Sequence, residues 1–199
     1  MIKAIIFDIG GVVLKPKSFH PVTQEYAKMM NLEKDRVHEI FKKIWYMWRV
    51  DEINENEFFD KLTKELKIQA DKEKLRKIFY SVWELDEGTF EMIGKLRKNY
   101  KIFALTNQSR ELFSSLSKEY GLSKIFDKIF TSYETKLAKP DPKIYEYMLG
   151  ETGMKPGECV FIDDKDENVE RAGKLGMKAL LFENAEQTEN ELRKLGVNF

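Results

Sequence analysis

The sequence predicts an α/β fold built on a parallel sheet, with an all-helical insert after the first strand. Short apolar runs rich in branched residues occur once at the start of the chain and four times in its second half. Helical patterns separate the later runs, an alternation typical of βαβ units and a parallel sheet. Residues 20–83, by contrast, show only helical patterns.

The first predicted strand runs from Ala4 to Phe7, a continuous apolar run of the kind found in the middle of a parallel sheet. Asp8 stands where this strand ends, and Gly10-Gly11 lets the backbone turn tightly because glycine has no Cβ. A carboxylate at this end of a central strand lies where open α/β sheets bind ligands. On these residues alone, the alternative is that Asp8 merely caps a turn.

The helical insert is predicted from four successive amphipathic patterns. Apolar residues recur at helical spacing from about His20 to Trp83, with charged residues between them. We therefore expect an all-helical inserted domain over residues 16–85 and an α/β core domain over residues 1–15 and 86–199.

Four further strands are predicted in the core after the insert. Their apolar runs cover residues 101–105, 128–131, 159–162 and 178–182. Right-handed crossovers between parallel strands place the carboxyl ends of all the strands at one edge of the sheet. Residues that follow different strands are therefore expected to meet there.

Composition excludes several classes of partner. Lysine plus arginine equals aspartate plus glutamate, 34 each, so no global field attracts nucleic acid or an anionic membrane. The apolar runs are too short to span a bilayer, and the chain enters its first strand with no room for a signal peptide. The single cysteine, Cys159, forms no internal disulfide. We expect a cytoplasmic protein, a monomer or a homodimer, whose partner is a small molecule.

Polar residues of a particular kind follow the predicted strands. They are Asp8 after the first strand, Thr106-Asn107 after the second, Lys139 after the third and Asp163-Asp164 after the fourth. Each has an ordinary alternative when taken alone: a helix N-cap pair, a local turn or a solvated lysine. Such a run of coincidences, each at a strand end, is much less expected than any one of them.

Together these residues indicate chemistry on a phosphoryl group. Asp8 with one or both of Asp163 and Asp164 makes the hard oxygen cluster that Mg²⁺ prefers, completed by waters and a substrate phosphate. Lys139, the Thr106 hydroxyl and loop N–H groups oppose the charge of the phosphoryl oxygens.

The same residues resemble the motifs of the haloacid dehalogenase (HAD) superfamily, over essentially the whole chain. Residues 7–12 match its first motif, and residues 105–107, 139–142 and 161–164 with Asn168 resemble the other three. The fourfold match is highly specific. It implies a three-layer, Rossmann-like parallel sheet in the order 3-2-1-4-5, counting core strands along the chain. The insert is similar to the C1-type cap of this family.

The resemblance implies a role for each site residue. Asp8 would be the nucleophile that forms an aspartyl-phosphate, with Lys139 and Asp163 as the other catalytic residues. Asp163 would act mainly through a metal-bound water. Mg²⁺ would lie between Asp8, the Gly10 carbonyl and Asp164. The residues expected to bind the phosphoryl group are Gly10, Gly11, Thr106, Asn107 and Lys139.

One position departs from the family pattern. Phosphatases of this superfamily usually carry a second aspartate two residues after the nucleophile, as general acid and base, and here that residue is Gly10. Such a group typically contributes about 10²–10⁴-fold in rate. His20, at the start of the cap and close in sequence to the nucleophile, is the candidate substitute. The alternative is an exposed helix-start histidine without a role, and His38 in the middle of the cap is assigned none.

Three functions are therefore open. The first is a Mg²⁺-dependent phosphatase for a small phosphorylated metabolite, for which sugar anomeric phosphates are attractive because they need the missing acid least. The second is a 2-haloacid dehalogenase, which also lacks the second aspartate but needs no Mg²⁺, so that the Asp163-Asp164 pair argues against it. The third is a regulatory protein that binds a phosphorylated ligand without turnover, for which Gly10 is the only support.

Overall fold

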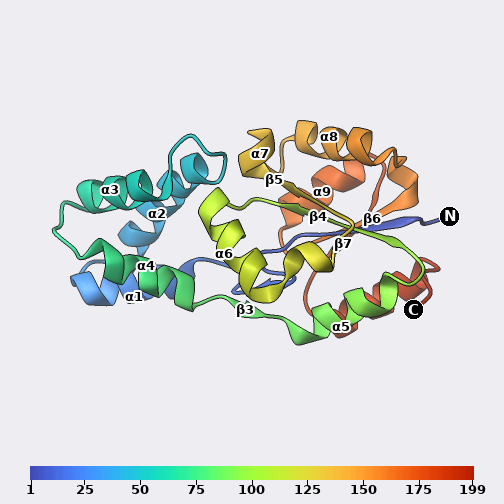
Figure 1. The fold of residues 1–199 in the computed structure, drawn as a ribbon, viewed down its shortest axis with the longest axis horizontal. Coiled ribbons are helices and arrows are strands. Elements are labelled where there is room, and N and C mark those ends of the chain that lie inside the picture. Colours follow the sequence, from blue (N-terminus) through green and yellow to red (C-terminus); the bar gives the residue numbers. More distant parts are fainter.

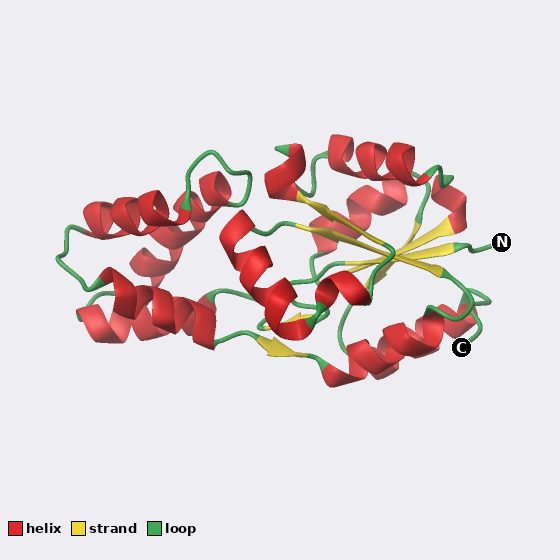
Figure 2. Ribbon diagram, viewed as in Figure 1, coloured by secondary structure: helices red, strands yellow, loops and turns green.

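The computed structural model describes all 199 residues and contains a five-stranded parallel sheet in the order β5-β4-β1-β6-β7 (Figures 1 and 2). The strands are β1 (Ala4–Phe7), β4 (Lys101–Thr106), β5 (Lys128–Thr131), β6 (Cys159–Asp163) and β7 (Lys178–Leu181). Since these are the five core strands along the chain, the predicted parallel sheet and its 3-2-1-4-5 order are confirmed.

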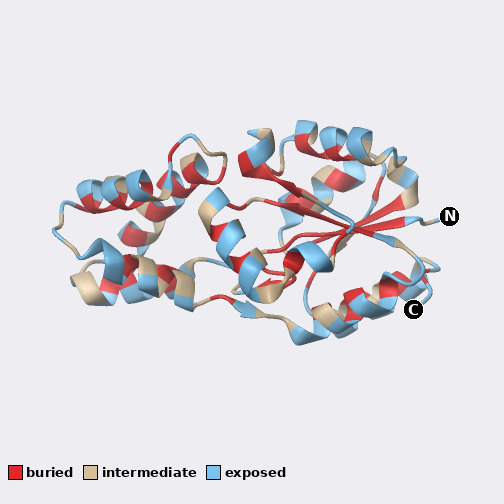
Figure 3. Cartoon of the chain, in the orientation of Figure 1, coloured by how far each residue is buried: buried red, intermediate tan, exposed pale blue.

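Helices cover both faces of the sheet. Alternate residues of β1 point to opposite faces, and since all of them are apolar, both faces must be covered. Ile5 and Phe7 belong to a large apolar cluster that includes residues of α5, α6 and α10. Ala4 and Ile6 belong to a second cluster with residues of α8 and α9. The three central strands are almost wholly buried, whereas the two edge strands are only partly buried (Figure 3). These helices are α5 (Glu87–Leu96), α6 (Arg110–Tyr120), α8 (Pro142–Thr152), α9 (Asp166–Lys174) and α10 (Ala185–Lys194), and the short α7 (Ser132–Thr135) follows β5.

The predicted helical insert forms four helices that lie together at the end of the molecule opposite both termini (Figure 1). Trp48, Phe58 and Phe79 form its centre, with ring centroids of Trp48 and Phe58 4.5 Å apart and those of Trp48 and Phe79 5.4 Å apart. Asn54 and Glu57 form a capping box that starts the third helix. The helices are α1 (His20–Met30), α2 (Lys34–Trp48), α3 (Glu55–Leu66) and α4 (Lys72–Ser81).

A short antiparallel strand pair joins the helices to the core. β2 (Leu14–Lys15) follows the loop after Asp8 and pairs with β3 (Glu84–Leu85), where the chain returns to the core. Sequence analysis missed this pair because two residues are too few to show a strand period. We propose that the cap, expected over residues 16–85, joins the core here.

The far end of the cap also rests on the core. Asp51, in the connection between α2 and α3, accepts hydrogen bonds from Arg110 at 2.9 Å and from Lys136 at 2.6 Å. The Trp48 indole N–H donates to Glu111 of α6 at 2.9 Å. The cap is therefore held against the sheet edge at two places, the strand pair and this contact. No helix of the chain has the length and apolar character needed to cross a membrane.

Candidate active site

The site lies at the carboxyl edge of the sheet, where β1 sits between β4 and β6. Phe7 pairs with Ala104 on one side and with Ile162 on the other. The next residue, Asp8, donates its N–H to the Ile162 carbonyl at 2.8 Å. Asp8 and Asp163 therefore emerge side by side. The parallel register alone brings together two residues separated by most of the chain.

Lys139 connects these two carboxylates. Its Nζ lies 2.9 Å from Asp8 Oδ2 and 2.6 Å from Asp163 Oδ2. The three residues are 1%, 6% and 0% exposed, respectively, so the ion pairs are shielded from water. A buried lysine is tolerated because both of its carboxylate partners are in place. The structure thus brings together the three residues for which the sequence predicts catalytic roles.

Charge is unbalanced in this cluster, because one ammonium faces three carboxylates. Burial raises the pKa of the Asp8 carboxyl to about 7, against the opposing effect of Lys139 and with a further rise from Asp163. Burial and Asp163 also raise the pKa of Asp164 to about 6. The pKa of Lys139 lies above its ordinary value, because the attraction of Asp163 and Asp8 exceeds the effect of burial. The cluster therefore favours an additional positive charge.

Asp8, Asp163 and Asp164 together fit a divalent cation. One oxygen of each lies within 4.8 Å of the others, and Asp164 Oδ1 is buried without a hydrogen-bond partner. Gly11 makes this approach sterically feasible. A Cβ on residue 11 would lie 2.5 Å from an Asp164 oxygen, and its φ of +88° also favours glycine.

A second layer of hydrogen bonds fixes the cluster. Asn107 donates to the Lys139 carbonyl and accepts from the Lys139 N–H, both at 2.9 Å. Asn168 donates to Asp163 Oδ1 at 2.9 Å. The Asn107 carboxamide is therefore engaged with the Lys139 backbone, whereas the buried Thr106 hydroxyl has no partner. Of these two predicted phosphoryl-binding residues, Thr106 is the one with a free side chain.

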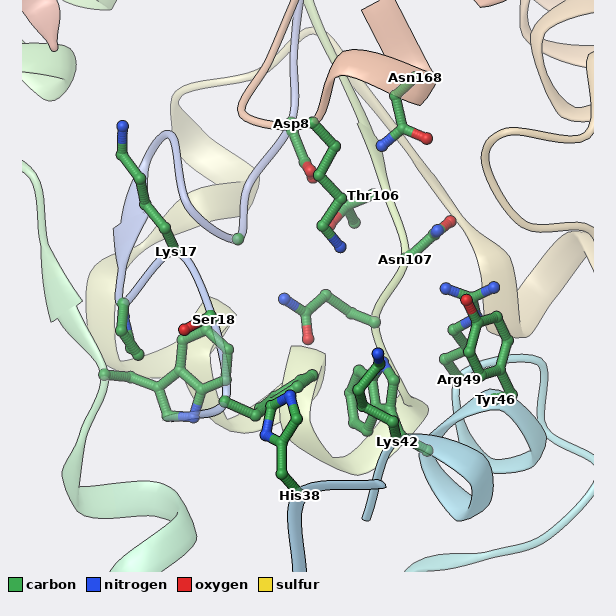
Figure 4. Close-up of a pocket in the computed structure, with 17 residues that line it drawn as sticks. Asp8, Lys17, Ser18, His38, Lys42, Tyr46, Arg49, Thr106, Asn107 and Asn168 are labelled. Carbon is green, nitrogen blue, oxygen red and sulfur yellow. The ribbon is translucent and has the colours of Figure 1, made fainter. Parts of the chain in front are cut away.

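A cavity of about 200 Å³ lies next to the cluster, between the core and the cap (Figure 4). Asp8, Gly10, Thr106 and Asn107 line it from the core. From the cap and its connections, the lining includes Phe19, His38, Lys42, Trp45, Tyr46, Arg49 and Trp83. Eight buried side chains in the chain have an unpaired polar atom, and five of them line this cavity: Arg49, Trp83, Thr106, Gln108 and Asn168.

The two histidines of the cap occupy different positions. His38 lines the cavity, whereas His20 is exposed and is not part of the lining. His20 stacks on His38 with ring centroids 4.0 Å apart, and its Nδ1 lies 3.1 Å from Ser18 Oγ. The His38 ring is held by Thr23 Oγ1 at 3.1 Å. Burial lowers the pKa of His38, with a further lowering from His20 and Lys42. The structure therefore gives no support to His20 as the acid and base.

Gln108 occupies the space next to Gly10. A Cβ on residue 10 would lie 3.0 Å from Gln108 Nε2. Gln108 is 3% exposed, and its Oε1 has no partner. A carboxamide thus stands where a side chain at position 10 would extend. It can donate and accept hydrogen bonds but supplies no proton at neutral pH.

Sequence analysis missed Gln108 and the cationic residues of the cavity. Gln108 directly follows the Thr106-Asn107 pair, so its position after a strand was a usable signal. Arg49 and Lys42 carried no such signal, because charged residues on an amphipathic helix are usually solvated. Only the docking of α2 over the sheet edge turns them toward the site.

Several known proteins are similar to this chain in sequence. The model of a family described as a haloacid dehalogenase-like hydrolase matches residues 2–176. D-ribitol-5-phosphate phosphatase of Bacteroides thetaiotaomicron is 27% identical over 204 residues, covering 96% of this chain and 97% of that protein. Flavin mononucleotide hydrolase 1 of Arabidopsis thaliana is 27% identical over 198 residues, covering 98% of this chain and 78% of that protein.

Solved structures agree with the fold. A HAD family enzyme from Bacteroides thetaiotaomicron, crystallised with magnesium and inorganic phosphate, superposes with a TM-score of 0.80 at 23% identity, covering 92% of this chain and 96% of that one. A HAD phosphatase from Thermococcus onnurineus gives a TM-score of 0.67 at 27% identity and covers 99% of each chain. The predicted enzyme class is confirmed: the chain belongs to the haloacid dehalogenase-like hydrolase family.

Proposed function

We propose that this protein is a Mg²⁺-dependent phosphatase that hydrolyses a small phosphorylated metabolite through an aspartyl-phosphate on Asp8. The observation that carries the proposal is the buried cluster in which Lys139 pairs with Asp8 and Asp163 below the cavity. A carboxylate that attacks an anionic phosphoryl group meets repulsion, and a fixed ammonium beside it reduces that repulsion. The D-ribitol-5-phosphate phosphatase relative supports the same class of substrate.

The reaction has two steps. First, an Asp8 oxygen bonds to phosphorus while the bond from phosphorus to the substrate oxygen breaks, and the leaving oxygen takes a proton from water. Second, water attacks phosphorus and gives up a proton to solvent, which replaces the one taken in the first step, while the bond to Asp8 breaks and inorganic phosphate leaves. Lys139 holds Asp8 in position for both steps, and the unpaired Thr106 hydroxyl is available to a phosphoryl oxygen.

The residues that would hold Mg²⁺ are Asp8, Asp164 and the Gly10 carbonyl, with Asp163 acting through a water. Their fit rests on the converging carboxylates and the unpaired Asp164 oxygen. When bound, the cation supplies positive charge opposite the phosphoryl oxygens. The magnesium and phosphate complex of the structural relative is in keeping with this assignment.

Cavity size and the residue at position 10 narrow the substrate. A cavity of about 200 Å³ is smaller than the roughly 300–1,000 Å³ typical of pockets for drug-sized ligands. A compact metabolite therefore suits it better than a flavin nucleotide. Since Gly10 and its neighbour Gln108 supply no acid, esters with good leaving groups, including anomeric sugar phosphates, should react fastest.

The two other functions are less well supported. A dehalogenase attacks carbon and has no use for a cation, whereas here three carboxylate oxygens converge. A protein that only binds ligand has no need of a paired, buried nucleophile such as Asp8. Each alternative has its own assay, halide release for the dehalogenase and ligand binding without turnover for the regulatory protein.

The test is a screen of small phosphate monoesters with Mg²⁺, run with wild type beside Asp8→Asn. We expect phosphate release by wild type and a loss on the order of 10⁴-fold or more in Asp8→Asn, because the nucleophile is gone. Halide release from 2-haloacids without added metal would reverse the assignment to a dehalogenase. Tight binding of phosphate esters with no product over hours would favour the regulatory function.

A further inference from the structure

Arg49 is the only buried arginine of the seven in the chain, and its charge has no partner. It is 9% exposed, lines the cavity and forms no ion pair, and its Nε has no hydrogen-bond partner. Arg76, by comparison, pairs with Glu55 and Glu73. Isolated buried charges are expensive, so a protein that keeps one at a cavity wall usually receives the compensating charge from a ligand.

The compensation available within the protein is small. The guanidinium stacks on the Tyr46 ring at 3.9 Å from the centroid and lies at the C-terminal end of α2. Both features favour a cation, but each is worth less than the cost of burying one. Glu167 is the acidic residue whose charge acts on Arg49 most, yet it is exposed and makes no ion pair with it.

The backbone that carries the Arg49 guanidinium is also held in place before any ligand arrives. Ser132, buried at the start of α7, donates its Oγ–H to the Arg49 carbonyl at 2.5 Å. Two residues further on, Asp51 is fixed by Arg110 and Lys136. The Arg49 backbone is thus bound to the core, while the Arg49 side chain faces the cavity from the cap side (Figure 4). A preorganised fork of N–H donors suits an anion with two or more oxygens.

The charged residues that line the cavity also favour an anionic ligand. The cationic residues of the lining are Lys17, Lys42, Arg49 and Lys165, and its one acidic residue is Asp8. Asp8 is already paired with Lys139. Lys42 has Glu39 within 3.7 Å, and Lys17 donates to the Phe182 and Glu183 carbonyls. A substrate whose only charge is the phosphoryl group would therefore leave Arg49 unmatched.

We propose that Arg49 forms a second anion subsite, so that the substrate carries a carboxylate or a second phosphate in addition to the phosphoryl group that is removed. This inference rests on the proposed phosphatase function and narrows its substrate class. The phosphoryl group binds at Asp8 and Thr106, the second anion binds at Arg49, and the short organic body between them contacts Trp45 and Trp83.

The test compares phosphate esters that differ only in the second anion. Phosphoglycolate and longer phosphorylated hydroxy acids are each assayed beside the alkyl phosphate of equal length, and ethylene glycol bisphosphate represents a second phosphate. We expect wild type to prefer the doubly anionic esters, and Arg49→Met to lower kcat/KM for them by about 10- to 100-fold, mainly through KM. Alkyl phosphates place no second anion at Arg49, so Arg49→Met should lower kcat/KM less for them, and the ratio of kcat/KM between doubly anionic and alkyl esters should fall. The better of the carboxylate and bisphosphate arms identifies the anion.

Two further variants separate charge from structure. Arg49→Lys should recover part of the preference. Lys43→Met removes a positive charge from the same helix at an exposed residue outside the cavity, and should leave the preference unchanged. Thermal stabilisation by each ester is measured in parallel, so that binding is seen even without turnover.

The outcomes distinguish the two proposals. Hydrolysis without preference for a second anion, or a preference that survives Arg49→Met, overturns the subsite and leaves the phosphatase standing. Stabilisation that depends on Arg49 and on the second anion, without hydrolysis of any ester, supports the subsite and overturns the phosphatase. An absence of both hydrolysis and stabilisation overturns both.

Discussion

The cavity has a core half, lined by residues at the sheet edge, and a cap half, lined by residues of the helical insert. The two halves differ in whether their buried charges are paired within the protein. On the core side, Lys139 satisfies Asp8 and Asp163 within about 3 Å, and Asn107 and Asn168 fix the partners in turn. On the cap side, Arg49 is buried without a partner. The protein itself thus supplies a charged partner for Asp8 and Asp163, whereas it supplies none for Arg49 and leaves that charge to a ligand. This difference separates residues that should control both stability and turnover from residues that should control substrate choice alone.

Removing the core cation should have the largest effect. Lys139→Met leaves Asp8 and Asp163 buried without a positive partner, so we expect a loss of about 3–5 kcal/mol in the free energy of unfolding, together with loss of phosphatase activity. Urea denaturation of the metal-free protein measures the first quantity. Lys136→Met, at an exposed lysine near Lys139 in sequence, is the matched control and should change stability by less than about 1 kcal/mol. Equal effects of the two changes would remove the distinction between the halves.

Gly10 supplies no acid for the leaving group, so the residue at position 10 should limit the rate for esters with poor leaving groups. Gly10→Asp alone places a Cβ 3.0 Å from Gln108 Nε2, so the new carboxylate competes with the carboxamide for space. The double variant Gly10→Asp with Gln108→Ala removes that conflict and should raise kcat for simple alkyl phosphates by roughly 10²-fold. The ratio of alkyl to p-nitrophenyl phosphate turnover is the readout. An unchanged ratio in the double variant would show that leaving-group protonation does not limit the reaction.

The raised pKa values in the core cluster predict how pH and Mg²⁺ change the stability of the protein. The pKa of Asp8 is about 7 in the folded protein, well above its ordinary value of 3.8, so the folded state keeps a proton that the unfolded state has lost. Stability of the metal-free protein should therefore fall as pH rises, by on the order of 2 kcal/mol between about pH 5.5 and pH 8. Mg²⁺ competes with that proton and should raise the melting temperature more at the higher pH. An equal rise in melting temperature with Mg²⁺ at pH 5.5 and at pH 8 would contradict the assignment of these carboxylates as metal ligands.

Removing the cap cation should have the smallest effect on the unliganded protein. Arg49→Met deletes an unpaired charge and keeps an apolar stem against Tyr46, so the free energy of unfolding should change by less than about 1 kcal/mol. Calorimetry without ligand measures it. A large destabilisation would mean that Arg49 holds the cap together and is not reserved for a ligand.

The same contrast explains what could be predicted from the sequence. Asp8 follows β1 and Asp163 ends β6, and parallel register carries these strand ends to one edge. Lys139 lies in the loop beyond β5 and α7, on the same connection, so local patterns sufficed to bring the core half together. The approach of Arg49 depends on how one helical unit docks on another, which no local pattern encodes. His20 shows the same limit from the other side: it lies closer to Asp8 in sequence than His38 does, yet His38 is the histidine that reaches the cavity.

Mass spectrometry of the enzyme, acid-quenched during turnover of p-nitrophenyl phosphate with Mg²⁺, tests the central claim most directly. The account predicts one added phosphoryl group on the peptide that contains Asp8, and none on Asp8→Asn. Phosphate release under saturating substrate with Asp8 unmodified, or with the label on another residue, would contradict it.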